Sequence, residues 1–335
     1  FGDDGAIFKL DCFNNDDDTS HSGNGFNPFF MGQSDSFNDD LSFRTHLNSL
    51  IMQMLAMNEN VEMQSLTSRE QDSLDEAIDA VLRQDDKSLW TFSNFYHHLE
   101  QDIARKLKRW VEDGFYASLF DNDVDAMGAI DKRFMAFNLG NVRNNEKILA
   151  IIMSEIFYRI SKSFEADIYR SAPKYLDIDE AHILLKVDYI RNFIVEKNRT
   201  WRKYKAGLGM WSQSPVEFLK LDDWEALRSC ASSFIFLADG QMNKEIYQKC
   251  FGLTNGECDV IRTLQPQKDA LIIQRELGIS KKVILDVEKE QYVMVTSTAD
   301  EVLLRDNNIR AYGFDEGIRK TVSQLFRMGE HEKRI

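Results

Sequence analysis

The spacing of apolar residues divides the chain into a helical part and a part in which strands and helices alternate. Between about residue 41 and residue 118, apolar side chains recur every three or four positions, as in LSFRTHLNSLIMQMLAM and TFSNFYHHLEQDIARKLKRWV. This spacing places the apolar side chains on one face of a helix, which is then buried. Another run, LTSREQDSLDEAIDAVLRQ, begins with Thr67 and Glu70 at the spacing of a capping box. The pattern predicts an all-helical subdomain.

After residue 118, short apolar runs typical of buried strands alternate with helical runs. The predicted strands are RFMAFNL, KYLDIDEAHILL, AGLGMWSQ and SSFIFLA, and the longest predicted helix is NNEKILAIIMSEIFYRISKSF. Strands that alternate with helices of this length form a parallel sheet that helices cover on both faces. Ahead of the helical subdomain, AIFKLDCF predicts a further strand, the polar run NNDDDTSHSGNG a loop, and FNPFF a turn anchored by aromatic residues.

Three β-prone runs follow one another near the C-terminus, namely ALIIQREL, KKVILDVE and QYVMVTST. They predict an antiparallel extension of the sheet. The predicted fold class is therefore α/β, with a mostly parallel sheet flanked by helices, an all-α insertion and a C-terminal β extension. We expect residues 1–40 to form the N-terminal edge of the core, 41–118 the insertion, and 119–335 the rest of the core with the β-rich segment.

Composition supports a packed globular protein, since 43% of the 335 residues are hydrophobic and only 4 are Pro. No apolar run reaches the roughly 18 to 20 residues that a membrane helix needs. The formal charge of -14 disfavours wholesale binding to nucleic acid, although a local basic channel stays possible. The cysteines at 12, 230, 250 and 258 form no CxxC pair, so we expect neither a zinc site nor a disulfide framework, which fits a reducing cytoplasm.

The run YLDIDE at 175–180 is an apolar strand that ends in two acids. Ligands bind at the carboxyl ends of strands in open α/β sheets, and this run has the form of a Walker B element. Asp179 would hold Mg²⁺ directly or through water, and Glu180 would orient or deprotonate the water that attacks a nucleoside triphosphate. The alternative is a strand-to-helix junction in which one acid caps the helix that His182 begins. We assign no chemistry to His182.

A second polar strand end follows in AGLGMWSQSP, where Ser212 and Gln213 come directly after an apolar run. Gln213 would sense the γ-phosphate or hold the lytic water if this strand lies beside the acidic one. The alternative is that SQSP is only a turn.

Between the two strand ends lies the basic cluster RTWRKYK, which contains Arg199, Arg202 and Lys203. Arg202 would act as an arginine finger in a neighbouring subunit's site or contact a DNA phosphate. The alternative is a solvated helix end, where cations meet the helix dipole.

The chain resembles the C-terminal ATPase domain of the TraC-type conjugative-transfer ATPases of type IV secretion systems, in the HerA/FtsK-like branch of P-loop motors. The resemblance spans nearly the whole chain and rests on features in order: FNPFF, the LTSRE helix start, DEAH, RKY before SQSP, and DVEKEQYVMVTSTADE. It aligns Asp179 with the metal-binding acid, Glu180 with the catalytic acid, and Gln213 with the glutamine after the next strand. Two departures are FMAFNLGN, where relatives tend to place an acid, and Ser212, where Thr is common.

The resemblance implies a P-loop NTPase fold, ATP and Mg²⁺ as cofactors, and a homo-oligomer at the cytoplasmic face of the bacterial inner membrane. There it would work with other secretion components and couple ATP hydrolysis to pilus assembly and to transfer of DNA or protein.

A Walker A loop, G-x-x-x-x-G-K-[ST], is missing, because none of the 17 glycines is followed by Lys. Together with Phe1 in place of Met, this predicts the downstream part of a longer ATPase, so no phosphate-binding residue is assigned. The alternative function is a non-catalytic interaction module that keeps the fold. A DEAH-type helicase is disfavoured, because SQSP stands where such enzymes carry a SAT-like motif.

Overall fold

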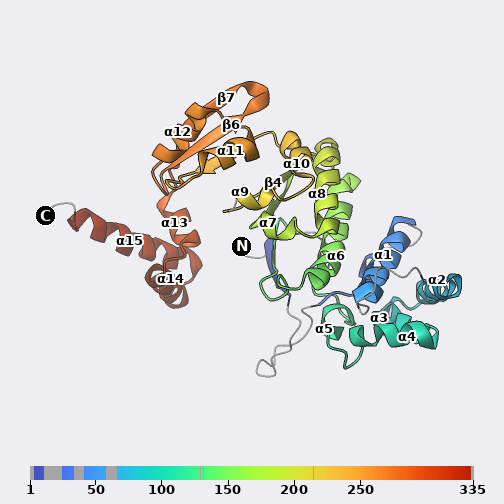
Figure 1. The fold of residues 1–335 in the computed structure, drawn as a ribbon. Helices are drawn as coiled ribbons and strands as arrows, with labels where there is room; N and C mark the ends of the chain where they lie inside the picture. The colour runs from blue at the N-terminus through green and yellow to red at the C-terminus, as the bar shows by residue number, and fades with distance from the viewer. Residues whose placement is uncertain are drawn as a thin grey trace. The chain divides into compact units, whose positions relative to one another are not determined.

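The computed structural model describes residues 4–10, 25–33, 41–57, 66–128, 130, 132–213 and 215–332 (Figure 1). The predicted loop NNDDDTSHSGNG, together with Cys12 and Ser214, lies largely or wholly outside these residues. The chain forms two compact units, Phe1–Cys230 and Ala231–Ile335, which are described separately below. The predicted domain boundaries at residues 40 and 118 both fall inside the first unit and stay predictions.

Four strands of the first unit form two parallel pairs. Strand β1 (Gly5–Lys9) pairs with β2 (Phe134–Asn138), and β3 (Lys174–Ile178) pairs with β4 (Ala206–Met210). The predicted parallel arrangement is therefore confirmed for these four strands. The described residues do not join the two pairs into one continuous sheet, however, because β2 pairs only with β1 and β3 only with β4.

The segment after β1 is helical in its described residues, as the spacing of apolar residues predicts. Its α-helices are α1 (Leu41–Met57), α2 (Ser68–Leu82), α3 (Phe92–His97), α4 (Gln101–Leu107) and α5 (Ala117–Phe120), with short 3-10 turns η2 (Phe30–Gln33), η3 (Lys87–Leu89) and η4 (Lys108–Trp110). The predicted capping box is confirmed, since the Thr67 hydroxyl accepts a hydrogen bond from Glu70 N and the Glu70 carboxylate accepts one from Thr67 N.

The central helix of the first unit is α6 (Glu146–Glu165), which starts where the Asn145 side chain accepts a hydrogen bond from Ile148 N. Its middle turns are buried because both α1 and α8 (Asp188–Thr200) pack against it. Around it lie further elements: η5 (Asp167–Tyr169), α7 (Ala181–Leu184), η6 (Trp201–Tyr204), α9 (Pro215–Phe218) and α10 (Trp224–Cys230). Helix α6 thus contributes much of the apolar core of the first unit.

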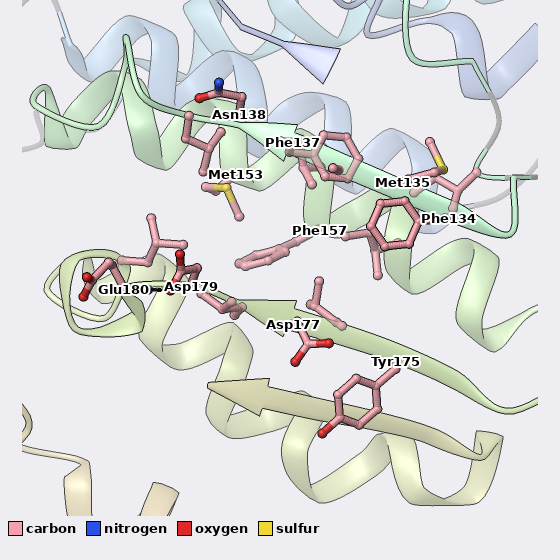
Figure 2. A pocket seen from close by; sticks show the side chains of 18 of the residues that line it. Phe134, Met135, Phe137, Asn138, Met153, Phe157, Tyr175, Asp177, Asp179 and Glu180 are labelled. Atoms are coloured by element: carbon pink, nitrogen blue, oxygen red, sulfur yellow. Dashed lines mark hydrogen bonds between the residues drawn. The ribbon is translucent and has the colours of Figure 1, made fainter. Parts of the chain in front are cut away.

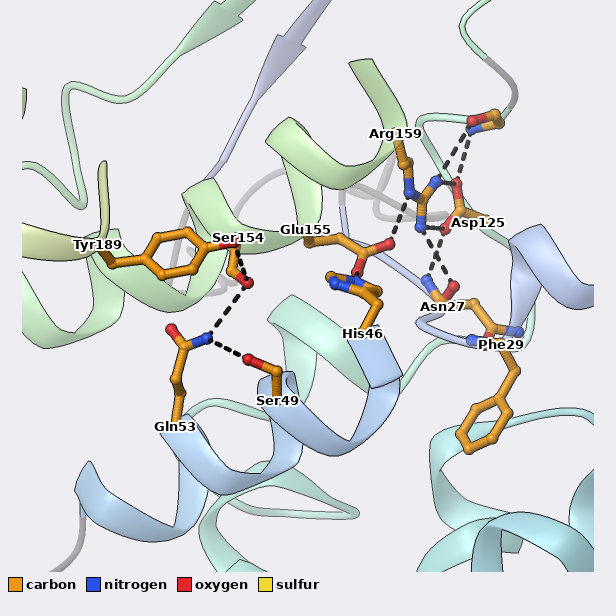
Figure 3. Close-up of polar contacts among 11 residues, drawn as sticks. Asn27, Phe29, His46, Ser49, Gln53, Asp125, Ser154, Glu155, Arg159 and Tyr189 are labelled. Atoms are coloured by element: carbon orange, nitrogen blue, oxygen red, sulfur yellow. Dashed lines mark hydrogen bonds and ion pairs between the residues drawn. The ribbon is translucent and has the colours of Figure 1, made fainter. Parts of the chain in front are cut away.

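A buried ion network fixes α6 to the FNPFF turn and to α1 (Figure 3). The Arg159 guanidinium donates to Glu155 Oε1 at 2.6 Å and to both Asp125 oxygens at 2.7 Å, and its Nη2 donates to the Asn27 carbonyl at 3.2 Å. Glu155 Oε2 lies 2.7 Å from His46 Nε2. The Arg159, Glu155 and Asp125 side chains are fully buried. The network therefore joins four segments that are distant in sequence.

The charges of this network stabilise one another inside the protein. Burial lowers the pKa of Arg159, but Glu155 and Asp125 outweigh burial, so that the pKa lies above its usual range. Burial likewise raises the pKa of Glu155, yet Arg159 and His46 outweigh it and the pKa is lowered. Arg159 and Glu155 consequently both stay charged around neutral pH.

The second unit contains a three-stranded antiparallel sheet in the order β5 (Phe234–Leu237), β6 (Asp269–Gln274), β7 (Ile279–Ile284). Helix α12 (Asn255–Thr263) contacts β6, and α11 (Lys244–Phe251) packs on α12. The antiparallel β6 and β7 were predicted, but the placement of SSFIFLA in the parallel sheet is wrong. Strand β5 pairs with β6 instead, since Phe236 shares a core with Leu271 and Ile273.

The last predicted strand, QYVMVTST, is also wrong, because most of it belongs to helix α13 (Lys289–Val295). The chain continues as helices α14 (Ala299–Tyr312) and α15 (Phe314–Glu332). A short 3-10 turn, η7 (Arg275–Leu277), lies between β6 and β7. Val293 is buried where α13 packs on α15, and the Tyr292 hydroxyl donates to Glu301 of α14. Tertiary packing thus overrides the β preference of a Val-rich run. The C-terminal β extension ends at Ile284. None of the helices that the structure describes is both long and apolar enough to cross a membrane.

Candidate functional site

The carboxyl ends of β3 and β4 are held together by the backbone. Ile178 lies opposite Met210 in the parallel register. Beyond this pair, Trp211 N donates to the Ile178 carbonyl at 2.9 Å, and Ala181 N donates to the Trp211 carbonyl at 2.8 Å. The two acids after β3 therefore lie at the same end of the pair as the polar segment after β4.

Glu180 stands at the N-cap position of α7 in a left-handed conformation, with φ +45° and ψ 44°. Such a conformation is unfavourable for a residue with a β-carbon. Neither acid caps α7 through its side chain, and Asp179 Oδ1 instead accepts a hydrogen bond from Glu180 N at 2.9 Å. The structure therefore gives the two carboxylates no helix-capping role.

One oxygen of Glu180 is buried beside His182. Glu180 Oε2 lies 3.2 Å from His182 Nδ1, but among the described residues it accepts no hydrogen bond of normal geometry. The same His182 nitrogen lies 2.8 Å from Ser212 Oγ. Buried carboxylate oxygens nearly always have a donor. Apart from the neighbouring His182, Glu180 Oε2 is therefore available to accept a proton or a hydrogen bond from a further group.

Both acids line a cleft of about 640 Å³ in the first unit (Figure 2). Strand β2 forms one wall, β3 and the start of α7 form the other, and α6 side chains that include Met153 and Phe157 form the floor. The volume lies within the roughly 300–1,000 Å³ that is usual for ligand sites. The acids stand at the end of this cleft where β3 stops.

Gln213 is exposed and follows β4 at the same end as the acids, but it makes no hydrogen bond to Asp179 or Glu180 in the described part of the chain. The parallel pairing brings it to the predicted edge of the sheet. Its predicted role depends on a ligand between these groups.

Arg202 lies at the opposite end of the pair, in η6 directly before β4. There Lys174 N donates to the Lys205 carbonyl at 3.0 Å, and β3 and β4 start together. A strand of five residues is about 16 Å long, so Arg202 is separated from the acids of its own chain. This end is basic: Arg199, Arg202 and Lys203 line a surface depression, and burial and the neighbouring Lys205 lower the pKa of Lys174.

Sequence reasoning missed the face that β3 and β4 share. A β-carbon at Gly207 would lie 2.6 Å from the Tyr175 ring, and one at Gly209 would lie 2.2 Å from Asp177 Oδ1. The two glycines therefore let these β3 side chains lie across β4, where Trp211 Nε1 donates to Asp177 Oδ1 at 2.9 Å. The alternating glycines of AGLGM were the available signal. Tyr175 remains 64% exposed and Trp211 46% exposed.

The two acids are better suited to a magnesium ion that is bound to a phosphate ligand than to a metal ion held by the protein alone. No group of three or more His, Cys, Asp or Glu side chains in the described residues is arranged to hold a metal. Mg²⁺ in phosphate-processing sites usually takes one or two carboxylates and completes its shell with water and phosphate oxygens. Asp179 is the side chain that would hold such an ion.

Comparison with known proteins identifies relatives of this chain. No protein-family model matches the sequence. The type IV secretion system protein VirB4 of Bartonella henselae is 25% identical over 262 residues, which cover 77% of this chain and 33% of that protein. VirB4 of Bartonella quintana is 24% identical over 259 residues, which cover 76% of this chain and 32% of that protein. The chain is a homologue of the VirB4 proteins. The resemblance to TraC-type ATPases, which are the same family, is therefore confirmed.

One solved structure supports the fold of this VirB4 homologue. VirB4 of Thermoanaerobacter pseudethanolicus superimposes with a TM-score of 0.53 at 17% identity, over 83% of this chain and 75% of that one. The fold is accordingly that of a P-loop ATPase, with parallel strands and a majority of helix. A weaker match, with a TM-score of 0.45 at 12% identity, is the plasmid coupling protein TrwB in complex with ADP and Mg²⁺, over 84% of this chain and 74% of that one. The chain spans about a third of the length of the curated relatives it matches.

Proposed function

We propose that this VirB4 homologue is part of an ATPase that couples ATP hydrolysis to pilus assembly and to the transfer of DNA or protein by a type IV secretion system. One observation carries the proposal. Asp179 and Glu180 stand where β3 ends at a cleft, and a buried oxygen of Glu180 accepts no hydrogen bond of normal geometry from the described residues. A catalytic base needs such a free acceptor, whereas a structural carboxylate would be saturated with donors.

Each residue has a separate task in this proposal. Asp179 holds Mg²⁺, and bound MgATP supplies the γ-phosphoryl group that is transferred. Glu180 accepts the proton of the attacking water, and His182 keeps the Glu180 carboxylate beside the end of β4. Gln213 contacts the γ-phosphate or the water from β4. Arg202 lies at the other end of the strand pair and acts on a neighbouring subunit's nucleotide or on nucleic acid.

The position of Arg202 supports assembly into an oligomer. Because Arg202 lies at the amino ends of β3 and β4, it cannot stabilise phosphate at the acids of its own chain. A ring or stack of subunits would bring the Arg199, Arg202 and Lys203 surface to another subunit. We place this oligomer at the cytoplasmic face of the bacterial inner membrane, in contact with other secretion components.

The test uses a longer, full-length protein that contains this chain and carries a Walker A loop, G-x-x-x-x-G-K-[ST], ahead of it. Glu180→Gln should leave MgATP binding within a few-fold and lower kcat by about 10²–10⁴-fold, the usual loss for a missing general base. Asp177→Asn is the matched control, since it removes one carboxylate charge from the same strand, at a side chain that accepts a hydrogen bond from Trp211. Retained turnover in Glu180→Gln would reduce Glu180 to a structural residue.

The isolated chain gives a second test. The phosphates of P-loop ATPases rest on a Walker A loop that these 335 residues lack. Calorimetry should therefore show weak MgATP binding or none. Micromolar affinity would contradict this expectation.

A second candidate function is favoured by the missing Walker A motif itself. In this alternative the chain is a non-catalytic module that keeps the fold and binds other secretion components without ATP turnover. The DNA directly upstream decides between the two functions. An in-frame Walker A sequence supports the ATPase, and a stop codon with no Walker A sequence supports the module.

A further inference from the structure

A single imidazole nitrogen lies between the polar residues that follow β3 and β4. His182 Nδ1 is 2.8 Å from Ser212 Oγ and 3.2 Å from Glu180 Oε2. The contact with Ser212 has the geometry of a hydrogen bond, whereas Glu180 Oε2 accepts none of normal geometry from the described residues. A ring nitrogen carries either one hydrogen or one lone pair, so it forms one good hydrogen bond at a time. His182 is therefore bonded to the segment after β4 and only adjacent to the acid after β3.

The backbone fixes these three side chains close to one another. Ala181 N donates to the Trp211 carbonyl at 2.8 Å, so the residue between Glu180 and His182 is tied to the residue before Ser212. The His182 side chain is largely buried, and it has little room to leave the group. Because hydrogen bonds weaken steeply as their angle closes, a small rotation of the imidazole is enough to exchange one oxygen for the other as the partner of Nδ1.

The hydroxyl of Ser212 decides which oxygen His182 contacts. It serves either tautomer of the imidazole, since it accepts a hydrogen bond from Nδ1–H or donates one to a bare Nδ1. Without this hydroxyl, Glu180 Oε2 stays beside Nδ1. A hydrogen bond to a carboxylate is roughly twice as strong as one between neutral groups. Loss of the hydroxyl would therefore turn His182 into a donor to Glu180.

A donor on Glu180 Oε2 would weaken Glu180 as a base. A hydrogen bond to a carboxylate stabilises its charged form and opposes protonation. General-base catalysis requires the opposite, because the carboxylate has to take a proton from water as the reaction proceeds. An imidazole that donates to Oε2 would also occupy the position from which the attacking water is deprotonated. The contact between Ser212 and His182 prevents both effects.

We propose that Ser212 is a positioning residue for ATP hydrolysis, which engages Nδ1 of His182 and so keeps Glu180 Oε2 open to the attacking water. This inference rests on the proposed function, in which Glu180 is the base. Ser212 directly precedes Gln213, the residue proposed to contact the γ-phosphate. A contact between Gln213 and the γ-phosphate therefore also fixes the position of the Ser212 hydroxyl, and bound nucleotide is coupled to the availability of the base.

Kinetics of the full-length protein that carries a Walker A loop test the role of the hydroxyl. Ser212→Ala should lower kcat about tenfold or more and leave the Kd for MgATP within about threefold, because only the base is affected. Ser212→Thr keeps the hydroxyl and should recover most of kcat. The control is Ser229→Ala, which removes a hydroxyl that donates to the Ala226 carbonyl in α10 and should leave kcat unchanged. An unchanged kcat in Ser212→Ala would overturn the proposal.

A second substitution separates this role from a structural one. His182→Phe keeps an aromatic ring but removes the competing nitrogen, so Ser212→Ala combined with His182→Phe should be about fivefold or more faster than Ser212→Ala alone. A hydroxyl that only stabilised the strand end, or only placed Gln213, would give no such recovery. A double variant that is as slow as Ser212→Ala, or slower, would therefore overturn the proposal. Should His182→Phe fail to fold, His182→Leu removes the same nitrogen and decides in its place.

Glu180→Gln in the same protein distinguishes a failure of this inference from a failure of the proposed function. Retained turnover in Glu180→Gln would contradict the proposed catalysis, whatever Ser212→Ala does. Lost turnover in Glu180→Gln together with an unchanged kcat in Ser212→Ala would leave Glu180 as the base and overturn only the role of Ser212. When Glu180→Gln is already present, Ser212→Ala should not lower the residual rate further, because no base is left for His182 to block. A further loss of similar size would overturn the proposal.

Discussion

Ser212 Oγ lies 2.8 Å from His182 Nδ1, and this nitrogen lies 3.2 Å from Glu180 Oε2. The imidazole thus connects the segment after β4 to the acid after β3. The carboxyl ends of the two strands are joined by side chains as well as by the backbone hydrogen bonds of Trp211. A site whose residues come from two strands depends on such a connection, because small displacements of one strand end would separate its groups.

We predict that His182 and Ser212 stabilise the fold as a pair. In a double-mutant cycle with His182→Ala and Ser212→Ala, the coupling in the free energy of unfolding should be about 0.5–1.5 kcal/mol, the net contribution of one hydrogen bond. Urea unfolding of the four proteins measures it. Thr200→Ala combined with His182→Ala serves as the control, because the Thr200 hydroxyl donates to Glu196 in α8. Additive effects of His182→Ala and Ser212→Ala would contradict the contact.

The second prediction concerns the buried Arg159. Arg159→Met should lower the free energy of unfolding by about 3–5 kcal/mol, because Glu155 and Asp125 would stay buried without their cation. Urea or thermal unfolding provides the measurement. Arg83→Met is the matched control, since Arg83 pairs with Asp79 at the surface and should cost less than about 1 kcal/mol.

Arg159→Lys distinguishes geometry from charge at the same position. The guanidinium donates to Glu155 through Nε and to Asp125 through both terminal nitrogens. A lysine ammonium cannot reproduce this fork. We therefore expect Arg159→Lys to recover only part of the lost stability, and full recovery would show that charge alone matters.

Features that depend on neighbouring residues were predictable from the sequence, and features that depend on distant partners were not. The capping box of Thr67 and Glu70 and the strand that ends at Asp179 each follow from a few consecutive residues. The Arg159 network joins residues up to 132 positions apart, and no local pattern indicates it. The pairing of β5 and the helical state of α13 were wrong for the same reason, since burial of Phe236 and Val293 depends on elements that come later in the chain.

The candidate site was predictable to a similar extent. The acids and Gln213 reach one edge of the sheet because parallel strands end together. The left-handed Glu180, its free oxygen and the cleft along β2 depend on three-dimensional packing. The chemistry of the site thus came from residue types, and its geometry came from the structure.

The third prediction is a pH dependence in the second unit. Burial raises the pKa of Glu257, but hydrogen bonds from Arg275 and Thr254 outweigh burial and lower it from 4.5 to about 2. The carboxylate therefore contributes stability fully above pH 4.5, and the contribution is lost as the pH falls from 4.5 toward 2. Glu257→Gln should cost about 1.5–3 kcal/mol at pH 7 and progressively less below pH 4.5.

Urea unfolding at several pH values measures this difference between the wild type and Glu257→Gln. Glu276→Gln is the control, because Glu276 is exposed and the variant removes the same charge beside Arg275. The free energy of unfolding of the wild type minus that of Glu257→Gln could instead stay constant between pH 7 and pH 3. That result would show that the charge of Glu257 contributes no stability through its pair with Arg275.

The last prediction uses the backbone of Glu180 to separate function from stability. Glu180 and Lys205 both adopt left-handed conformations, with φ of 45° and 54°. Glycine adopts this region without the steric penalty of about 1–2 kcal/mol that a β-carbon brings, although it loses more entropy on folding. Lys205→Gly should therefore raise the free energy of unfolding slightly or leave it unchanged.

If the Glu180 carboxylate serves a ligand and not the fold, Glu180→Gly should also raise the free energy of unfolding slightly or leave it unchanged. The same variant should abolish turnover in the protein that carries a Walker A loop. Destabilisation by Glu180→Gly alone, by more than about 1 kcal/mol, would show that the carboxylate supports the junction of β3 and α7, and the catalytic proposal would lose its main support.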